Sequence, residues 1–312
     1  MTGRSLSRIW PATAAAAILL AGISPALAQP GSAGLAFLKL GTSARGIAMA
    51  DAMAAVVTGP ASPAYNPAGL LGGDTSAAAE LLFTHREWIE GTRVEFLAGS
   101  TRISEGKAAG LAITSTTVPD IELRTQPGEP EGTFTARNFA AAGSFAYAFD
   151  EEFSAGITAK FLYEKILIDE ASGFAVDVGA RYVTPVEGLT LGAALANIGS
   201  MSSLRNEATK LPSMFRVGPA YSFSFSEGRT AVLTAADLLY IFPEKETYLN
   251  WGGEVEFDRT VAVRGGYQFG SAGRGLTAGM GIRYGIFCLD YAYAKLSQNL
   301  GNAHSFTLAL TL

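Results

Sequence analysis

The chain offers few side chains that could carry out chemistry. Its 312 residues include two histidines, His85 and His304, and a single cysteine, Cys288. Ser305 follows His304, but adjacent residues of a strand face opposite sides, and no Gly-x-Ser-x-Gly elbow or orienting acid accompanies them. A single cysteine cannot form an internal disulfide, and its spacing from other ligand residues gives no metal site. We therefore expect no enzyme, no metal site and no cofactor.

Charged residues follow a more regular pattern. They recur in stretches where large apolar side chains alternate with glycine, alanine, serine and threonine, and we assign them to the face of the small residues. Successive side chains of a strand point to opposite faces, so one face of each strand would be apolar and the other ionic. The charged residues assigned to the ionic face are Arg93, Glu95, Lys160, Glu164, Asp177, Arg181, Arg216, Asp237, Glu254, Glu256, Arg264, Arg283 and Asp290. Their signs nearly balance, which predicts ion pairs across a lumen instead of the single-sign ring of an ion-selective pore.

The elements that must position these charges are strands of membrane-spanning length. From about residue 77 onward, roughly fourteen stretches of about ten residues alternate with period two, the length that a tilted transmembrane strand needs. Aromatic residues gather on the apolar face or near strand ends, as in an interfacial girdle. The sequence therefore predicts an all-β fold, a transmembrane antiparallel β-barrel that occupies residues 75–312.

The two ends of the chain indicate where this barrel resides. A short basic stretch and an apolar run at 12–23 precede a small-x-small cleavage site at 26–28, so residues 1–28 are expected to be a cleaved signal peptide. The last residues, 304–312, alternate apolar with small or polar side chains to the final position, as a barrel-closing strand does. Together these features predict an integral protein of the bacterial outer membrane. Its expected partners are outer-membrane lipid and the barrel-assembly machinery.

Connection lengths and net charge support the same assignment. Short connections alternate with long ones along the chain, and the longest are expected at 118–134, 200–211 and 295–302. One end of the barrel would then carry tight turns and the other long loops, as outer-membrane barrels do. The net charge of −5, without a basic patch, excludes nucleic acid as an expected partner.

Residues 29–74 precede the strands and do not alternate. Ser43 is placed to cap a helix over about 44–57, followed by turn chemistry at 59–63 and 66–69. A barrel of this size is wide enough to need filling, so we expect the segment to enter the lumen as a hatch, or plug. A loose periplasmic tail is the alternative, although such a tail would be more polar.

Some hatch residues are candidates for specific roles. Arg45 is expected to pair with a lumen carboxylate, Glu254 or Glu256, and so to tether the hatch. The side chains that could contact a hydrophobic ligand are Met49, Met53, Val56, Val57 and Tyr65. Plain packing of hatch against wall explains the same residues, because flexible methionines commonly fill gaps.

Three stretches resemble a known family. Residues 34–52, together with the Asn66-Pro67-Ala68-Gly69 element and the closing stretch 289–306, closely resemble the ends of PorV/PorQ family outer-membrane proteins. That family is similar to the FadL long-chain fatty-acid channels, whose N-terminal hatch carries an Asn-Pro-Ala element. The resemblance implies a hatch motif made of Arg45 and residues 66–69.

The resemblance implies two different functions. PorV-like proteins act with the type IX secretion system as shuttle or docking proteins, and this is the function we expect first. The loops at 118–133 and 200–210 would then meet secreted cargo proteins or translocon components. The alternative is a FadL-like channel for uptake of hydrophobic small molecules, which would use the hatch contacts and a hydrophobic ligand.

Overall fold

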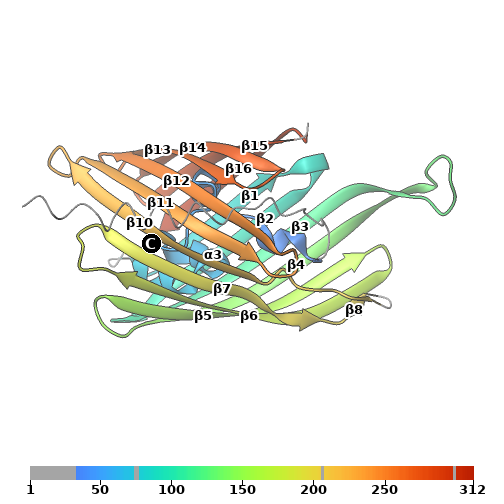
Figure 1. Cartoon of the computed structure of the whole chain (residues 1–312), viewed down its shortest axis with the longest axis horizontal. Helices are drawn as coiled ribbons and strands as arrows, with labels where there is room; N and C mark the ends of the chain where they lie inside the picture. The colour runs from blue at the N-terminus through green and yellow to red at the C-terminus, as the bar shows by residue number, and fades with distance from the viewer. Residues whose placement is uncertain (1–32, 74–76, 205–206, 298–299) are drawn as a thin grey trace, which may run out of the picture.

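The chain folds into a closed antiparallel barrel. The computed structural model describes residues 33–73, 77–204, 207–297 and 300–312, so the expected signal peptide lies outside the described residues. Fourteen strands close the barrel in the order β1-β16-β15-β14-β13-β12-β11-β10-β7-β6-β5-β4-β3-β2. The predicted fold class is therefore confirmed (Figure 1). Among the described residues, no helix has the length and apolar character needed to cross a membrane.

The strands follow the alternating stretches of the sequence. Their bounds are β1 Glu80–Glu87, β2 Arg93–Ser104, β3 Lys107–Leu123, β4 Gly132–Ala148, β5 Phe153–Ile166, β6 Asp169–Val183, β7 Leu189–Met201, β10 Met214–Phe225, β11 Thr230–Ile241, β12 Glu246–Phe257, β13 Val261–Phe269, β14 Arg274–Tyr284, β15 Phe287–Leu296 and β16 Asn302–Thr311. The barrel closes where β1 pairs with β16, with Glu80 opposite Thr311 and Phe83 opposite Leu308. The apolar side chains of Phe83 and Leu308 point outward, at 45% and 41% exposure.

The two faces of the wall differ as the alternation predicts. On β4, Phe145 is 41% exposed, whereas the neighbouring Ser144 is 8% exposed and bonds to Thr158 inside the barrel. The exposed surface carries phenylalanine, leucine, isoleucine and valine on every side of the barrel. Such a surface is stable against the acyl chains of a membrane but not against water. The protein is therefore an integral outer-membrane barrel.

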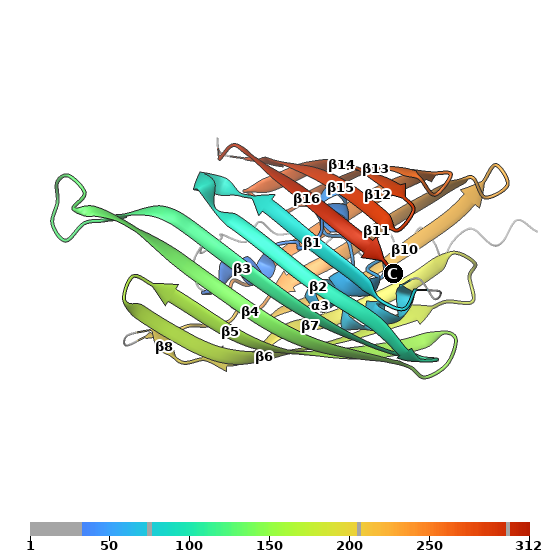
Figure 2. The same ribbon diagram turned by 180° about the vertical axis from the view of Figure 1, so that it is seen from behind.

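The connections separate into a loop end and a turn end. The C-terminus and the tight turns lie at one end, and the β3–β4 hairpin projects far beyond the other end in both views (Figures 1 and 2). The loop expected at 118–134 is shorter, because β3 continues to Leu123 and β4 begins at Gly132. A register shift between Val118 and Ile121 lets the ladder continue past the rim. The expected loop at 200–211 contains a small two-stranded ribbon, β8 Ser203–Leu204 and β9 Glu207–Ala208.

The N-terminal segment, residues 33–73, lies inside the barrel (Figures 1 and 2). Its elements are η1 Ala36–Lys39, α2 Ala44–Ala48, η2 Gly59–Ala61, α3 Ser62–Tyr65 and η3 Pro67–Gly72, while η4 Ile89–Gly91 joins β1 to β2. Ser43 caps α2 as expected, accepting a hydrogen bond from the Gly46 N–H. The helix expected over 44–57 is wrong beyond α2, because the backbone turns left-handed at Ala50 and Asp51.

Candidate functional site

The N-terminal segment crosses the lumen from the loop end to the turn end. At the loop end, the Gly34 N–H donates to the Lys210 carbonyl at 3.0 Å, and Lys39 pairs with Glu244 at 2.6 Å. At the turn end, Arg102 donates to the Leu71 carbonyl at 3.0 Å. Between these points the segment packs against strands from opposite sides of the barrel. Its position is therefore fixed by polar contacts at both ends.

Arg45 stands at the centre of an ionic network. Its Nε and Nη2 atoms donate to the two carboxylate oxygens of Glu254, both at 2.8 Å. Arg264 donates to the same carboxylate at 2.5 Å and to Asp290 at 2.6 Å. Burial disfavours the Arg45 cation, but the facing Glu254 outweighs it and raises the pKa of Arg45 above its ordinary value. Of the two carboxylates expected for Arg45, the one that it contacts in the structure is Glu254. The two parallel hydrogen bonds fix the orientation of the guanidinium relative to the carboxylate.

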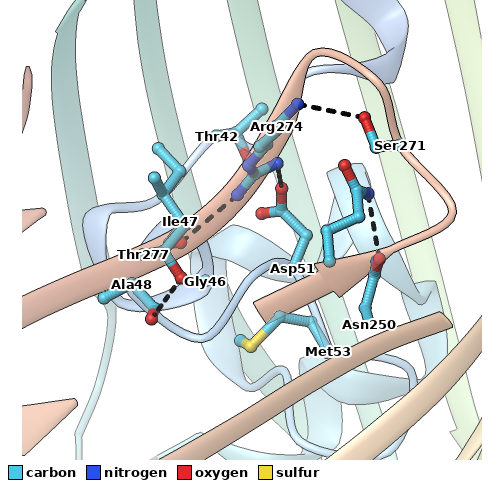
Figure 3. Close-up of polar contacts among 12 residues, drawn as sticks. Thr42, Gly46, Ile47, Ala48, Asp51, Met53, Asn250, Ser271, Arg274 and Thr277 are labelled. Carbon is cyan, nitrogen blue, oxygen red and sulfur yellow. Dashed lines mark hydrogen bonds and ion pairs between the residues drawn. The ribbon is translucent and has the colours of Figure 1, made fainter. Parts of the chain in front are cut away.

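A second cluster holds the turn that follows α2 (Figure 3). The Asp51 carboxylate lies 2.5 Å from Arg274 and accepts from the Tyr65 hydroxyl at 2.8 Å. Arg216 donates to the Asp51 carbonyl at 2.7 Å, and Thr277 donates to the Ala48 carbonyl at 2.8 Å. Left-handed backbone at a residue other than glycine costs of order 1–3 kcal/mol. These contacts keep Asp51 in that conformation, at a φ of 61°.

The Asn66-Pro67-Ala68-Gly69 element fixes the segment to the opposite wall. The Asn66 amide donates to the carbonyls of Ala54, at 2.7 Å, and of Ala180, at 3.0 Å. Its side-chain oxygen accepts from the Ala68 N–H at 3.1 Å. Gly179 makes this close approach possible, because a Cβ there would lie 2.1 Å from that oxygen. The motif therefore joins the segment to itself and to β6.

The candidate ligand contacts are packed side chains. Met49 and Tyr65 are 0% and 4% exposed and belong to the apolar cluster between segment and wall. Met53 and Val57 border one cavity, and Val56 borders another. The structure thus brings all of them together, with three of the five next to open space.

Most predicted lumen charges face inward. Lys160 pairs with Asp177 at 2.6 Å, and the Asp237 carboxylate accepts from the N–H groups of Met53 and Ala54 at 2.7 and 2.8 Å. Arg216 lies 3.9 Å from Asp237. Arg181, Glu256 and Arg283 also line the lumen, without an ion pair within the part of the chain that the structure describes.

Two of the predicted lumen charges are on the wrong face. Arg93 and Glu95 point outward, where Glu95 lies 3.5 Å from His85. The reason is that the first half of β2 turns Val94 and Phe96 inward, at 3% and 2% exposure, although Leu97 and Ile103 of the same strand point outward. Sequence reasoning also missed Asp51, Arg86 and Arg274. These charges lie in a loop-like stretch or opposite small residues, where the alternation pattern does not assign them to the lumen.

Cavities remain around the segment. Two of them lie at the turn end, with volumes of about 220 and 250 Å³, and both are bordered by Arg45 and Thr58. Another, of about 30 Å³, lies beside Phe37 and Leu38. Within the described ranges, no cluster of histidine, cysteine, aspartate and glutamate is arranged to hold a metal ion.

Comparisons with known proteins place the fold. No protein-family profile and no curated protein sequence matches the chain. Among solved structures, the Pseudomonas putida toluene transporter TodX is similar with a TM-score of 0.62 and 12% identity, over 86% of this chain and 96% of that one. A TodX deletion mutant, described as a monoaromatic hydrocarbon channel, gives 0.61 and 12% over 87% and 99%. A Pseudomonas aeruginosa FadL homologue gives 0.51 and 12% over 86% and 98%. At these identities the likeness shows the fold, a FadL-like barrel.

Proposed function

We propose that this protein is an outer-membrane channel for small hydrophobic molecules and that its N-terminal segment closes the channel. One observation carries the proposal. At the loop end of the lumen, Leu35 and Phe37 of the segment fill an apolar recess, at 2% and 5% exposure. The wall side chains of this recess are Ala140, Leu162, Ala171, Ala175, Met201 and Leu211. A pore for water-soluble molecules has a polar lining instead.

The recess favours apolar solutes on energetic grounds. Burial of a phenylalanine side chain contributes roughly 1.5–3 kcal/mol, which the segment loses when it leaves the recess. A hydrophobic solute that takes its place recovers a similar free energy. A polar solute does not, because its own desolvation is unfavourable. The likeness to channels named for toluene and monoaromatic hydrocarbons supports this direction.

A reversible cross-link tests whether the segment must move. A Cβ atom at Gly34 would lie 3.6 Å from the Cβ of Thr209 in the β7–β10 connection, a separation that a disulfide spans. We therefore expect Gly34→Cys/Thr209→Cys, made in a Cys288→Ser background, to stop uptake of radiolabelled toluene when oxidised. Reduction should restore it.

The cross-link experiment has its own controls. Gly34→Cys alone should transport toluene under both redox conditions. Cells that carry the unmodified protein should take up toluene faster than cells with an empty vector. Full uptake by the oxidised double variant, or no uptake above the empty vector, would contradict the proposal.

The docking function is a second candidate, and one observation favours it. The β3–β4 hairpin projects beyond the rim of the barrel, where a protein partner could reach it (Figure 2). A pull-down from outer membranes in mild detergent tests this candidate. Capture of type IX translocon components by the full chain, and their loss when residues 121–134 are deleted, would support docking. Equal capture by both chains would exclude the hairpin as the contact.

A further inference from the structure

Arg181 is a lumen arginine that lacks a charged partner among the described residues. Arg181 lies on β6 near the turn end, and its Nε atom is buried without a hydrogen bond. Within the described part of the chain it makes no ion pair, whereas Arg45, Lys160 and Arg264 each face a carboxylate within 2.8 Å. A partly buried cation without a counter-charge is costly, because it loses water and gains nothing in return. The guanidinium is therefore ready to accept an anion.

Arg181 borders the cavity of about 250 Å³ between the segment and strands β6, β7, β10 and β11. Hydroxyl groups of Thr58, Thr190 and Ser222 share its lining, and among the described residues no acidic side chain does. Among the cavity's arginines, Arg45 is already held by Glu254. The polar side of the cavity thus combines this cation with three hydroxyl groups, of which that of Ser222 also donates to the Gly188 carbonyl at 3.5 Å.

The other side of the same cavity is apolar. Ala55 and Val56 contribute from the segment, and Ala220 and Leu233 contribute from the wall. A site with a charged end and an apolar flank suits a molecule that has both. Its volume lies below the range of about 300–1,000 Å³ that is common for drug-sized ligands, so the occupant should be small.

We infer that this cavity binds the carboxylate of a small amphipathic acid, such as an aromatic or short aliphatic monocarboxylate. Arg181 would hold the carboxylate through two parallel hydrogen bonds, as guanidinium groups do. The hydroxyl groups would donate to the remaining lone pairs, while the apolar flank would cover the ring or chain. Inorganic phosphate would satisfy the arginine but leave the apolar flank uncovered. The inference rests on the proposed function only for the route by which such an acid arrives.

Direct binding tests this inference without transport. The purified full-length protein in detergent is titrated calorimetrically with sodium phenylacetate, and separately with phenylacetamide, which has the same shape but no charge. We expect the unmodified protein to bind phenylacetate at least tenfold more tightly than phenylacetamide. Arg181→Gln should remove that preference, and Arg181→Lys should restore part of it.

Matched variants separate the site from general effects. Arg229→Gln replaces an exposed arginine at the same end of the barrel and should bind phenylacetate like the unmodified protein. Thr190→Val keeps the shape of the threonine side chain but removes its hydroxyl group, and it should weaken binding of phenylacetate several-fold. This variant keeps the test valid even if an Arg181 variant fails to fold. Equal binding of phenylacetate by Arg181→Gln, or equal displacement by inorganic phosphate, would overturn the inference. Failure of the proposed function would appear separately, in the toluene uptake of the cross-linked protein.

Discussion

Removal of Arg45 should loosen the segment, and the structure sets the size of the effect. Arg45 makes two hydrogen bonds of 2.8 Å to Glu254 and is the ionic contact between α2 and the wall. In Arg45→Ala, Glu254 still pairs with Arg264, so no bare charge remains in the lumen. The loss is then that of a charge-assisted contact, about 1.5–3 kcal/mol, without the larger cost of a buried unpaired ion.

This loss should appear in single-channel recordings from planar bilayers. Each 1.4 kcal/mol changes an equilibrium tenfold, so the ratio of open to closed time should rise roughly 10- to 100-fold in Arg45→Ala. Glu256→Gln is the matched control, because Glu256 borders the same cavity without an ion pair among the described residues. It should raise the open time far less than Arg45→Ala does, because Glu256 attracts Arg45 without a hydrogen bond to it. Equal open times for Arg45→Ala and the unmodified protein would refute the view that this contact tethers the segment.

Two further perturbations follow from the same geometry. Burial alone would raise the pKa of Asp51, but the Arg274 guanidinium outweighs it and holds that pKa below its ordinary value of 3.8. The contact therefore stabilises the closed segment above that pH and is lost as the pH falls through the lowered pKa, so channel opening should increase in acid. Asp51→Asn should open more often at neutral pH and should show no further increase in acid. An increase in acid equal to that of the unmodified protein would contradict the assignment. Gly179→Ala places a Cβ 2.1 Å from the Asn66 side-chain oxygen and should detach the Asn66-Pro67-Ala68 element, which limited proteolysis of the segment would detect. Gly265→Ala should remain resistant, because its Cβ would lie 3.9 Å from the Thr277 carbonyl oxygen, an ordinary van der Waals contact.

The barrel was predictable from sequence because its signal repeats. Period-two alternation over membrane-spanning lengths recurs along the whole chain, and every such stretch became a strand. The β3–β4 hairpin was underestimated because proline at 119 suggested loop, while a register shift between Val118 and Ile121 accommodated it within the ladder. Local pattern thus located the strands better than their ends.

The lumen was predictable only in part. Alternation shows which residues share a face, but not which face is inside, and this is why Arg93 and Glu95 were misplaced. The segment offers apolar surface to β2, so Val94 and Phe96 turn inward there. The Arg45–Glu254 contact was expected because each residue was a conspicuous charge. The Asp51–Arg274 contact joins positions 223 apart in the sequence, and no local pattern connects them.

The central claim is that the apolar face of the wall contacts acyl chains while the other face lines the lumen. Nitroxide labels in native outer-membrane vesicles, read by power saturation against oxygen and a water-soluble nickel chelate, test it most directly. Labels at Phe145 and Phe223 should collide mainly with oxygen, and a label at Ser222 mainly with the nickel chelate. The opposite pattern would contradict the account.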